Sequence, residues 1–197
     1  MLASATRVEG PGLRFALWFQ GCPLRCRGCF NPHFFESSGG TDYSVEGLLD
    51  LIAQELSSSP ELEGVTLLGG EPLAQPVECA ELVRGVRDLG LSVLVFTGYT
   101  MKHLVSRADP QIMEIVANSD VVVAGPFLEN KLDRARPWLG SENQEYHFIS
   151  DRYGPADFTG PDGIEISIEK DGKVTLNGWA PSEDLMQLRH LGTEEPA

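Results

Sequence analysis

Three of the four cysteines lie within eight residues of one another, in the segment Gly21-Cys22-Pro23-Leu24-Arg25-Cys26-Arg27-Gly28-Cys29. The C-x3-C-x2-C spacing puts three thiols on one short loop, where they can bind three corners of a single metal site. Such crowding is typical of metal binding rather than of disulfides. An iron–sulfur cluster or a structural zinc site normally has four protein ligands, so the fourth comes from elsewhere in the chain or is not protein.

A zinc site completed by His33 or Cys79 is the first alternative. Zinc ribbons normally have paired C-x2-C knuckles, whereas this loop is single. Cys79 has apolar residues three and seven positions after it, so we expect it to be a small buried side chain of a helix. His33 precedes two phenylalanines, and we expect it to be packed or to cap a turn.

The elements around the loop follow an alternating pattern. Strand-like apolar runs occur at Arg14–Gln20, Val65–Leu68, Leu91–Thr97 and Asp120–Ala124, and the last three begin 26 and 29 residues apart. This is the spacing of βαβ units, whose buried strands are almost continuously apolar. Helical patterns lie between the runs: residues 45–56 after a Ser44 cap, 77–89, a turn at 101–106, and a helix after Asp109-Pro110. The sequence therefore predicts an α/β fold with a parallel sheet.

A second motif, Leu68-Gly69-Gly70-Glu71-Pro72, directly follows the second of these runs. It thus lies at the carboxyl end of a parallel strand, where such sheets bind ligands. Glycines let the backbone approach a ligand closely, and the Glu71 carboxylate can pair with a ligand ammonium group. Without the cysteine loop, the two glycines would indicate only a strand-to-helix turn.

Composition excludes two classes of protein. The 197 residues include 15 Lys and Arg against 29 Asp and Glu, a formal charge of −14, which argues against a nucleic-acid binder. The longest uncharged apolar run, residues 121–128, is far shorter than a membrane span, and residues 1–10 lack the apolar core of a signal peptide. We expect a cytoplasmic protein without a membrane partner.

The cysteine spacing and the Gly-Gly-Glu-Pro motif together resemble the radical S-adenosylmethionine (SAM) enzymes. Further motifs resemble the activating enzyme of anaerobic ribonucleotide reductase, over about residues 7–150 and in the same order. They are Gly10–Phe15, Asn31-Pro32, Phe96–Thr100, Gly125–Phe127 and Gly140–Gln144.

The resemblance implies a partial (βα) TIM-like barrel of radical SAM type with parallel strands, formed by residues 1–150. Residues 151–197 are then a C-terminal β-hairpin extension packed on this core, since Ile164–Glu169 and Lys173–Asn177 alternate around Asp171-Gly172. The extension either covers a sheet edge or docks a partner.

The resemblance also implies the chemistry. Cys22, Cys26 and Cys29 would bind one [4Fe-4S] cluster, and SAM would bind its open iron. One electron on the cluster cleaves SAM into methionine and a 5′-deoxyadenosyl radical, which removes hydrogen from a glycine of a large glycyl-radical enzyme resembling anaerobic ribonucleotide reductase. The protein positions SAM and excludes water.

Cofactor-binding residues follow from the same resemblance. Residues 28–30, with Gly28, Cys29 and Phe30, would form the SAM-facing edge of the loop, and the Phe30 ring would lie against adenine. Gly69, Gly70 and Glu71 would lie at the methionine end. Thr97 and Tyr99, at the end of the third predicted strand, are further candidates whose alternative role is packing.

The electron must come from outside the chain, because Cys79 is the only other cysteine and cannot build a second cluster. Flavodoxin or ferredoxin is the expected donor. Arg14, Arg25 and Arg27 either form a basic spot that faces this acidic donor or pair with local carboxylates.

Three positions depart from the family pattern. Ala124 stands where an acidic residue is usual, and Leu139 and Glu145 stand where arginine is expected. These departures and the added tail keep open the alternative of a small radical SAM enzyme that acts on a small molecule or peptide. A zinc-stabilised binding module without turnover is a further alternative, from a different class of protein.

Overall fold

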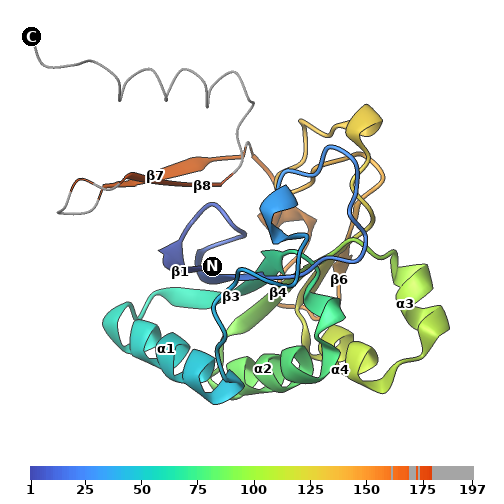
Figure 1. The fold of residues 1–197 in the computed structure, drawn as a ribbon. Helices are drawn as coiled ribbons and strands as arrows, with labels where there is room; N and C mark the ends of the chain where they lie inside the picture. The colour runs from blue at the N-terminus through green and yellow to red at the C-terminus, as the bar shows by residue number, and fades with distance from the viewer. Residues whose placement is uncertain (161, 169–171, 173, 179–197) are drawn as a thin grey trace, which may run out of the picture.

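The apolar runs form the inner strands of a six-stranded sheet, as seen in a computed structural model that describes residues 1–160, 162–168, 172 and 174–178. The strand order is β1-β2-β3-β4-β5-β6 (Figure 1). The strands are β1 (Leu2–Thr6), β2 (Leu13–Phe19), β3 (Leu62–Gly69), β4 (Ser92–Thr97), β5 (Val121–Ala124) and β6 (Glu145–Phe148).

The predicted parallel sheet is confirmed for the four inner strands. β2, β3, β4 and β5 pair in parallel, with registers such as Phe15↔Val65 and Leu94↔Val121. The two outer strands, β1 and β6, pair antiparallel with β2 and β5 and were not expected from the sequence. The fold is therefore mixed α/β with a mostly parallel central sheet.

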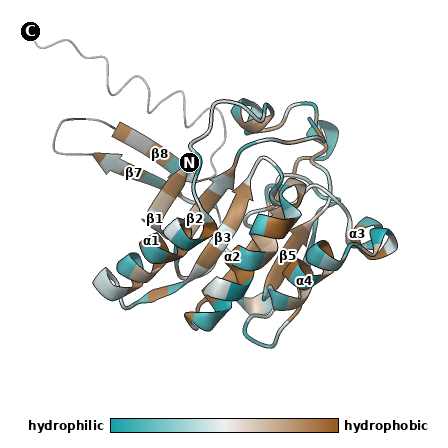
Figure 2. Ribbon diagram, turned by 60° about the horizontal axis from the view of Figure 1, so that its bottom comes forward, coloured by the Kyte–Doolittle hydropathy of each residue, from teal (hydrophilic) through white to brown (hydrophobic). Residues whose placement is uncertain are grey.

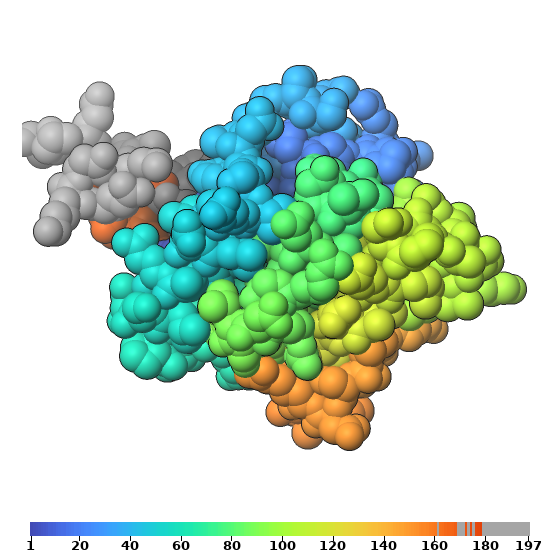
Figure 3. Space-filling view, turned by 90° about the horizontal axis from the view of Figure 1, so that it is seen from below, coloured from blue at the N-terminus to red at the C-terminus, as the bar shows by residue number. Residues whose placement is uncertain are grey.

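One layer of helices covers one face of this sheet. It contains α1 (Val45–Ser58), α2 (Pro76–Asp88), α3 (Met101–Arg107) and α4 (Pro110–Asn118). The expected Ser44 cap is present, since its Oγ accepts a hydrogen bond from Gly47 N. Asp109 is a cap that the sequence did not predict, and its carboxylate accepts from two backbone N–H groups at the start of α4. The strands behind the helices are apolar (Figure 2), and the helices lie side by side on this face (Figure 3).

Short 3-10 helices occur in the connections: η1 (Pro32–Phe34), η2 (Pro72–Ala74), η3 (Glu129–Lys131) and η4 (Pro155–Asp157). η1 follows the cysteine loop and η2 follows Glu71, so both lie where the site is built.

The main core lies between the helices and the sheet. Phe15, Leu17 and Phe19 of β2 point into it together with apolar residues of α1, α2 and α4. Cys79 of α2 is part of this core with none of its surface exposed, which confirms that it is a buried side chain.

The opposite face of the sheet is covered by loops and short 3-10 helices instead of α-helices. Ala16 and Trp18 of β2 pack there with Phe34, which follows the cysteine loop. Leu139, Tyr153 and Phe158 cover the same face beside β4 and β5. The loops that cover this face also provide the walls of the site.

A separate antiparallel hairpin, β7 (Ile164–Ile168) and β8 (Val174–Gly178), follows the sheet. It contacts the end of β1 through two residues. The Glu165 carboxylate accepts hydrogen bonds from Thr6 Oγ1 and Arg7 N, and Asn177 Nδ2 donates to Thr6 Oγ1. The predicted hairpin is thus present, although Asp171 of its turn and residues 179–197 of the extension lie outside the described residues. Within the described residues, no helix is both long and apolar enough to cross a membrane.

Candidate functional site

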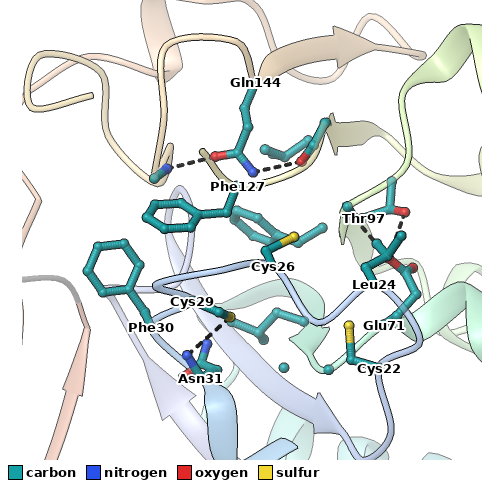
Figure 4. A pocket seen from close by; sticks show the side chains of 18 of the residues that line it. Cys22, Leu24, Cys26, Cys29, Phe30, Asn31, Glu71, Thr97, Phe127 and Gln144 are labelled. Carbon is teal, nitrogen blue, oxygen red and sulfur yellow. Dashed lines mark hydrogen bonds between the residues drawn. The ribbon is translucent and has the colours of Figure 1, made fainter. Parts of the chain in front are cut away.

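A pocket opens at the carboxyl ends of β3, β4 and β5, beneath the cysteine loop (Figure 4). All three clustered cysteines line it. The rest of its wall comes from the strand ends and from the segment after β5; the residues are Leu24, Phe30, Asn31, Phe35, Leu68–Glu71, Phe96–Gly98, Val123, Gly125, Phe127, Gly140 and Gln144. The pocket therefore joins the two motifs that the sequence singled out.

Backbone hydrogen bonds fix the base of the cysteine loop. Gly21 N and Cys22 N donate to the carbonyls of Phe34 and Phe35, both at 3.0 Å. Within the loop, Cys29 N donates to Cys26 O at 3.2 Å. The loop is thus a closed turn whose two ends are tied together, with its thiols half-buried toward the pocket.

The thiols suit an iron–sulfur cluster better than zinc. All three are free and face one cavity, and Asn31 N donates to Cys29 Sγ at 3.4 Å, a contact that supports a ligating sulfur. Burial raises the pKa of the Cys29 thiol. Among the described residues, no three His, Cys, Asp or Glu side chains are close enough to hold a single metal ion.

Neither predicted zinc partner completes the site. Cys79 is fully buried in the core, and burial raises the pKa of its thiol. His33 lies on η1 and is solvent-exposed, with its ring 4.2 Å from that of its neighbour Phe34, and it does not line the pocket.

Gly69 ends β3 and lies against β2, where a Cβ would be 2.7 Å from Phe19 N, whereas Gly70 approaches the cysteine loop itself. A Cβ on Gly70 would lie 2.4 Å from Gly21 O and 3.0 Å from Phe34 O. Gly70 N and Glu71 N donate to Phe19 O and Gly21 O, at 2.9 and 3.0 Å. Gly69 has a φ of +104°, which favours glycine. The sequence predicted that the backbone here would approach a ligand closely. In the structure the backbone at Gly70 instead makes its close contact with the loop that holds the thiols.

Glu71 lies in the pocket wall, and its carboxylate is hydrogen-bonded within the chain. Its Oε1 accepts from Leu73 N at 3.0 Å, and its Oε2 accepts from Gly98 N at 2.8 Å and Thr97 Oγ1 at 3.1 Å. The residue has no exposed surface. Burial raises its pKa from 4.5 to about 7, although these three donors oppose the shift. Glu71 thus ties the end of β3 to the end of β4.

This pKa predicts a pH-dependent stability. Because the folded chain holds the Glu71 proton to higher pH than the unfolded chain does, the free energy of unfolding should fall as pH rises from 4.5 to 7. The loss is about 3 kcal/mol, at about 1.4 kcal/mol per pKa unit. Glu71→Gln should remove this contribution, since the amide does not titrate. Urea unfolding at pH 5 and pH 8 measures it, and the same pH dependence in both proteins would contradict the prediction.

The remaining predicted residues separate into two groups. Thr97, Phe30 and Cys29 line the pocket, and the Phe30 ring meets that of Phe127 edge-on at 5.1 Å. Gly28 instead faces η3, where a Cβ would lie 2.7 Å from the Glu129 carboxyl carbon.

Tyr99 is also outside the pocket lining. Its ring stacks on His103 at 5.1 Å and packs against the helix-side core. Tyr99 thus has packing partners on the helix side of the sheet, and its contact with a cofactor stays a prediction.

Gln144 is a pocket residue that sequence reasoning included only as part of a family motif. Its Oε1 accepts from Gly140 N at 2.8 Å and Ser141 N at 3.1 Å, and its Nε2 donates to Gly125 O at 2.9 Å. This amide holds the two segments beside Phe127 together, so it shapes one wall of the pocket.

The three residues that depart from the family pattern lie in the core or on the surface. Leu139 is buried in the core beside β4 and β5, and Ala124 is buried at the end of β5. The Glu145 side chain, on β6, is 72% exposed. None of the three lines the pocket.

The expected basic spot is wrong for Arg14. Its guanidinium is fully buried and donates to Thr66 Oγ1, Val65 O and Ser92 Oγ, at 2.6, 2.8 and 3.1 Å. This network satisfies the buried charge within the sheet.

The alternative of local pairing is confirmed for the other two arginines. Arg25 pairs with Glu36 at 2.8 Å and Arg27 with Glu129 at 3.1 Å. Both pairs are solvent-exposed, so we expect little net stabilisation from them.

A cysteine loop over the ligand-binding edge of a parallel sheet defines a class of iron–sulfur protein, and residues 8–147 match the family described as "4Fe-4S single cluster domain". Similar relatives are named anaerobic ribonucleoside-triphosphate reductase-activating protein. The one from Salmonella typhimurium is 30% identical over 72% of this chain and 92% of the relative. That from Pasteurella multocida is 34% identical over 70% and 88%, and that from Enterobacteria phage T4 is 32% identical over 70% and 85%.

The chain therefore belongs to the family of radical SAM activating proteins of anaerobic ribonucleotide reductase, as the sequence motifs predicted.

Proposed function

We propose that this protein is a glycyl-radical activase whose pocket holds one [4Fe-4S] cluster and SAM. The observation that supports this most strongly is the gathering of three free thiols around one pocket, with Cys79 unavailable as a fourth ligand. Its relatives are named as activating proteins of an anaerobic reductase, and we propose a reductase of this kind as the partner.

Cys22, Cys26 and Cys29 would hold the cluster. When bound, the cluster and SAM supply reductive cleavage of SAM and hydrogen abstraction from a glycine of the partner. The chain's own part is to bind and orient. Gly69, Gly70 and Glu71 would place the methionine end of SAM.

The apolar wall would receive the other end of SAM. Phe30 and Phe127, which meet edge-on, offer a surface for adenine. Thr97 would contribute to the polar side beside Glu71, while Tyr99 supports the wall by packing.

Several finer features belong to the same proposal. Residues 1–150 act as the radical SAM core, with the sheet as part of a barrel, and residues 151–197 as an extension packed on it. The electron comes from a flavodoxin or ferredoxin, because the chain lacks cysteines for a second cluster. The reaction takes place in the cytoplasm, and the charge of −14 argues against a nucleic-acid partner.

The test is electron paramagnetic resonance of the partner. The reconstituted, reduced protein is incubated anaerobically with SAM and an anaerobic ribonucleotide reductase, with the Cys26→Ala protein as the control. A doublet from a glycyl radical on the reductase, absent in the control, is the expected result. SAM cleavage without a doublet would instead support a small-molecule or peptide target, and one bound zinc without iron would overturn both enzymatic functions.

A further inference from the structure

Leu24 lies between the first two cysteines, and its side chain fills the space beside Gly98, where any other residue would have a side chain. Its Cδ1 is 2.3 Å from the position that a Cβ on Gly98 would take. Gly98 is the first residue after β4, so the contact joins the cysteine loop to the end of a sheet strand.

The backbone conformation does not explain why residue 98 is glycine. Gly98 is not among the glycines with positive φ, so an alanine would fit its backbone. The next nearest atoms to this Cβ position are Glu71 Oε2 and Leu24 Cγ, both at an ordinary contact distance of 3.7 Å. The missing side chain therefore makes room for Leu24.

A partly buried hydrogen bond holds Gly98 in place. Gly98 N donates to Glu71 Oε2 at 2.8 Å, and Glu71 has no exposed surface. The loop beside Leu24 is sharply bent, since Arg25 has a φ of +46°. A non-glycine residue keeps such a conformation only where its surroundings hold it.

We propose that the contact between Leu24 and Gly98, called the lock below, positions the cysteine loop for cluster binding. Leu24 is the positioning residue, and Glu71 supports the contact by accepting a hydrogen bond from Gly98 N. The inference rests on the proposed function in that it concerns the cluster held by this loop. Leu24 lies two residues from both Cys22 and Cys26, so a shift of its backbone would displace both ligands. A displacement at the end of β4 would therefore move the cysteines that bind the cluster.

A set of variants tests the lock. Gly98→Ala inserts a methyl group into the space of the Leu24 side chain, and Leu24→Ala empties that space. The double variant Gly98→Ala/Leu24→Ala lets the new methyl group fill part of it. Gly154→Ala is the matched control, because Gly154 has a φ of −140° and nothing lies within 4 Å of its imagined Cβ.

The measurement is the rate at which the ferrous chelator bathophenanthroline removes iron from the anaerobically reconstituted proteins. The midpoint reduction potential of the cluster and the electron paramagnetic resonance spectrum of its reduced form are recorded for the same proteins. Gly98→Ala should lose iron about tenfold faster, as expected when the support of a metal ligand is disturbed. Its spectrum should also change. The double variant should recover most of this loss, and Gly154→Ala should match the wild type.

The outcomes separate the lock from the proposed function. A wild-type protein that takes up no [4Fe-4S] cluster would overturn the function and, with it, the lock. A loaded wild type with the same iron loss, potential and spectrum in Gly98→Ala would overturn the lock alone, as would a double variant no better than Gly98→Ala. If Gly98→Ala does not fold, Leu24→Ala decides: faster iron loss and a shifted potential are expected, and unchanged values would overturn the lock.

Discussion

Replacing Cys26 by alanine is expected to abolish cluster binding and, with it, SAM cleavage. Cys26 is one of three half-buried thiols around the pocket, and the remaining cysteine is fully buried in the core, so it cannot replace the lost ligand. Two thiolates on this loop are too few to hold the cluster. Iron and sulfide analysis after anaerobic reconstitution should fall from a full cluster to background.

Cys79→Ala is the matched control for this experiment. It removes a sulfur from the core between α2 and the sheet and should cost about 1 kcal/mol of stability through the small cavity that remains. Its iron content should equal that of the wild type. A full cluster in Cys26→Ala, or loss of iron in Cys79→Ala, would refute the assignment of ligands.

Gly70→Ala is expected to have the second largest effect. The added methyl group would meet two backbone oxygens, Gly21 O at 2.4 Å and Phe34 O at 3.0 Å. Backbone atoms cannot rotate away as a flexible side chain can, so the cysteine loop must move. Overpacking of this kind costs about 1–3 kcal/mol. We therefore expect lower stability together with poor cluster loading and SAM cleavage reduced by at least about tenfold.

Thermal unfolding and iron analysis measure these two effects separately. Gly154→Ala again serves as the control, because its methyl group would point into open space. Cluster content and SAM cleavage at wild-type levels in Gly70→Ala would show that the loop tolerates the displacement. The role of Gly70 as the contact between the two motifs would then be wrong.

The inner sheet was predictable because its strands are buried on both faces. Residues 13–19 of β2 are all buried, and a run of this kind shows in the sequence without knowledge of its neighbours. β1 and β6 have no such pattern. Glu145 is exposed at the start of β6, which has only four residues, and its pairing with β5 depends on the segment that folds back after residue 125.

The gathering of Cys22, Cys26 and Cys29 at one pocket was predictable from their spacing, but the contacts of the other residues were not. The pairing of a carboxylate with a ligand ammonium was a reasonable prediction for Glu71, yet its three donors come from Leu73, Thr97 and Gly98. Two of these lie on the next strand and its turn. Only the sheet register brings them within hydrogen-bond distance.

The surroundings of Arg14 could not be predicted from the sequence either. In the sequence it is a cation near the cysteines, which favours a surface role. In the fold it points into the sheet, where Tyr153 OH, 139 residues away, lies 3.2 Å from its guanidinium. Long-range partners of this kind determine whether a charged side chain is buried, and they are not visible in local sequence.

The most direct test of the account is whether this pocket cleaves SAM. The protein is reconstituted anaerobically with iron and sulfide, reduced with dithionite and incubated with SAM, both alone and with an anaerobic ribonucleotide reductase. Chromatography then quantifies 5′-deoxyadenosine and methionine. We predict both products in equal amounts, and neither in the Cys26→Ala protein. A full and reducible cluster that yields no 5′-deoxyadenosine, even with the reductase present, would contradict the account.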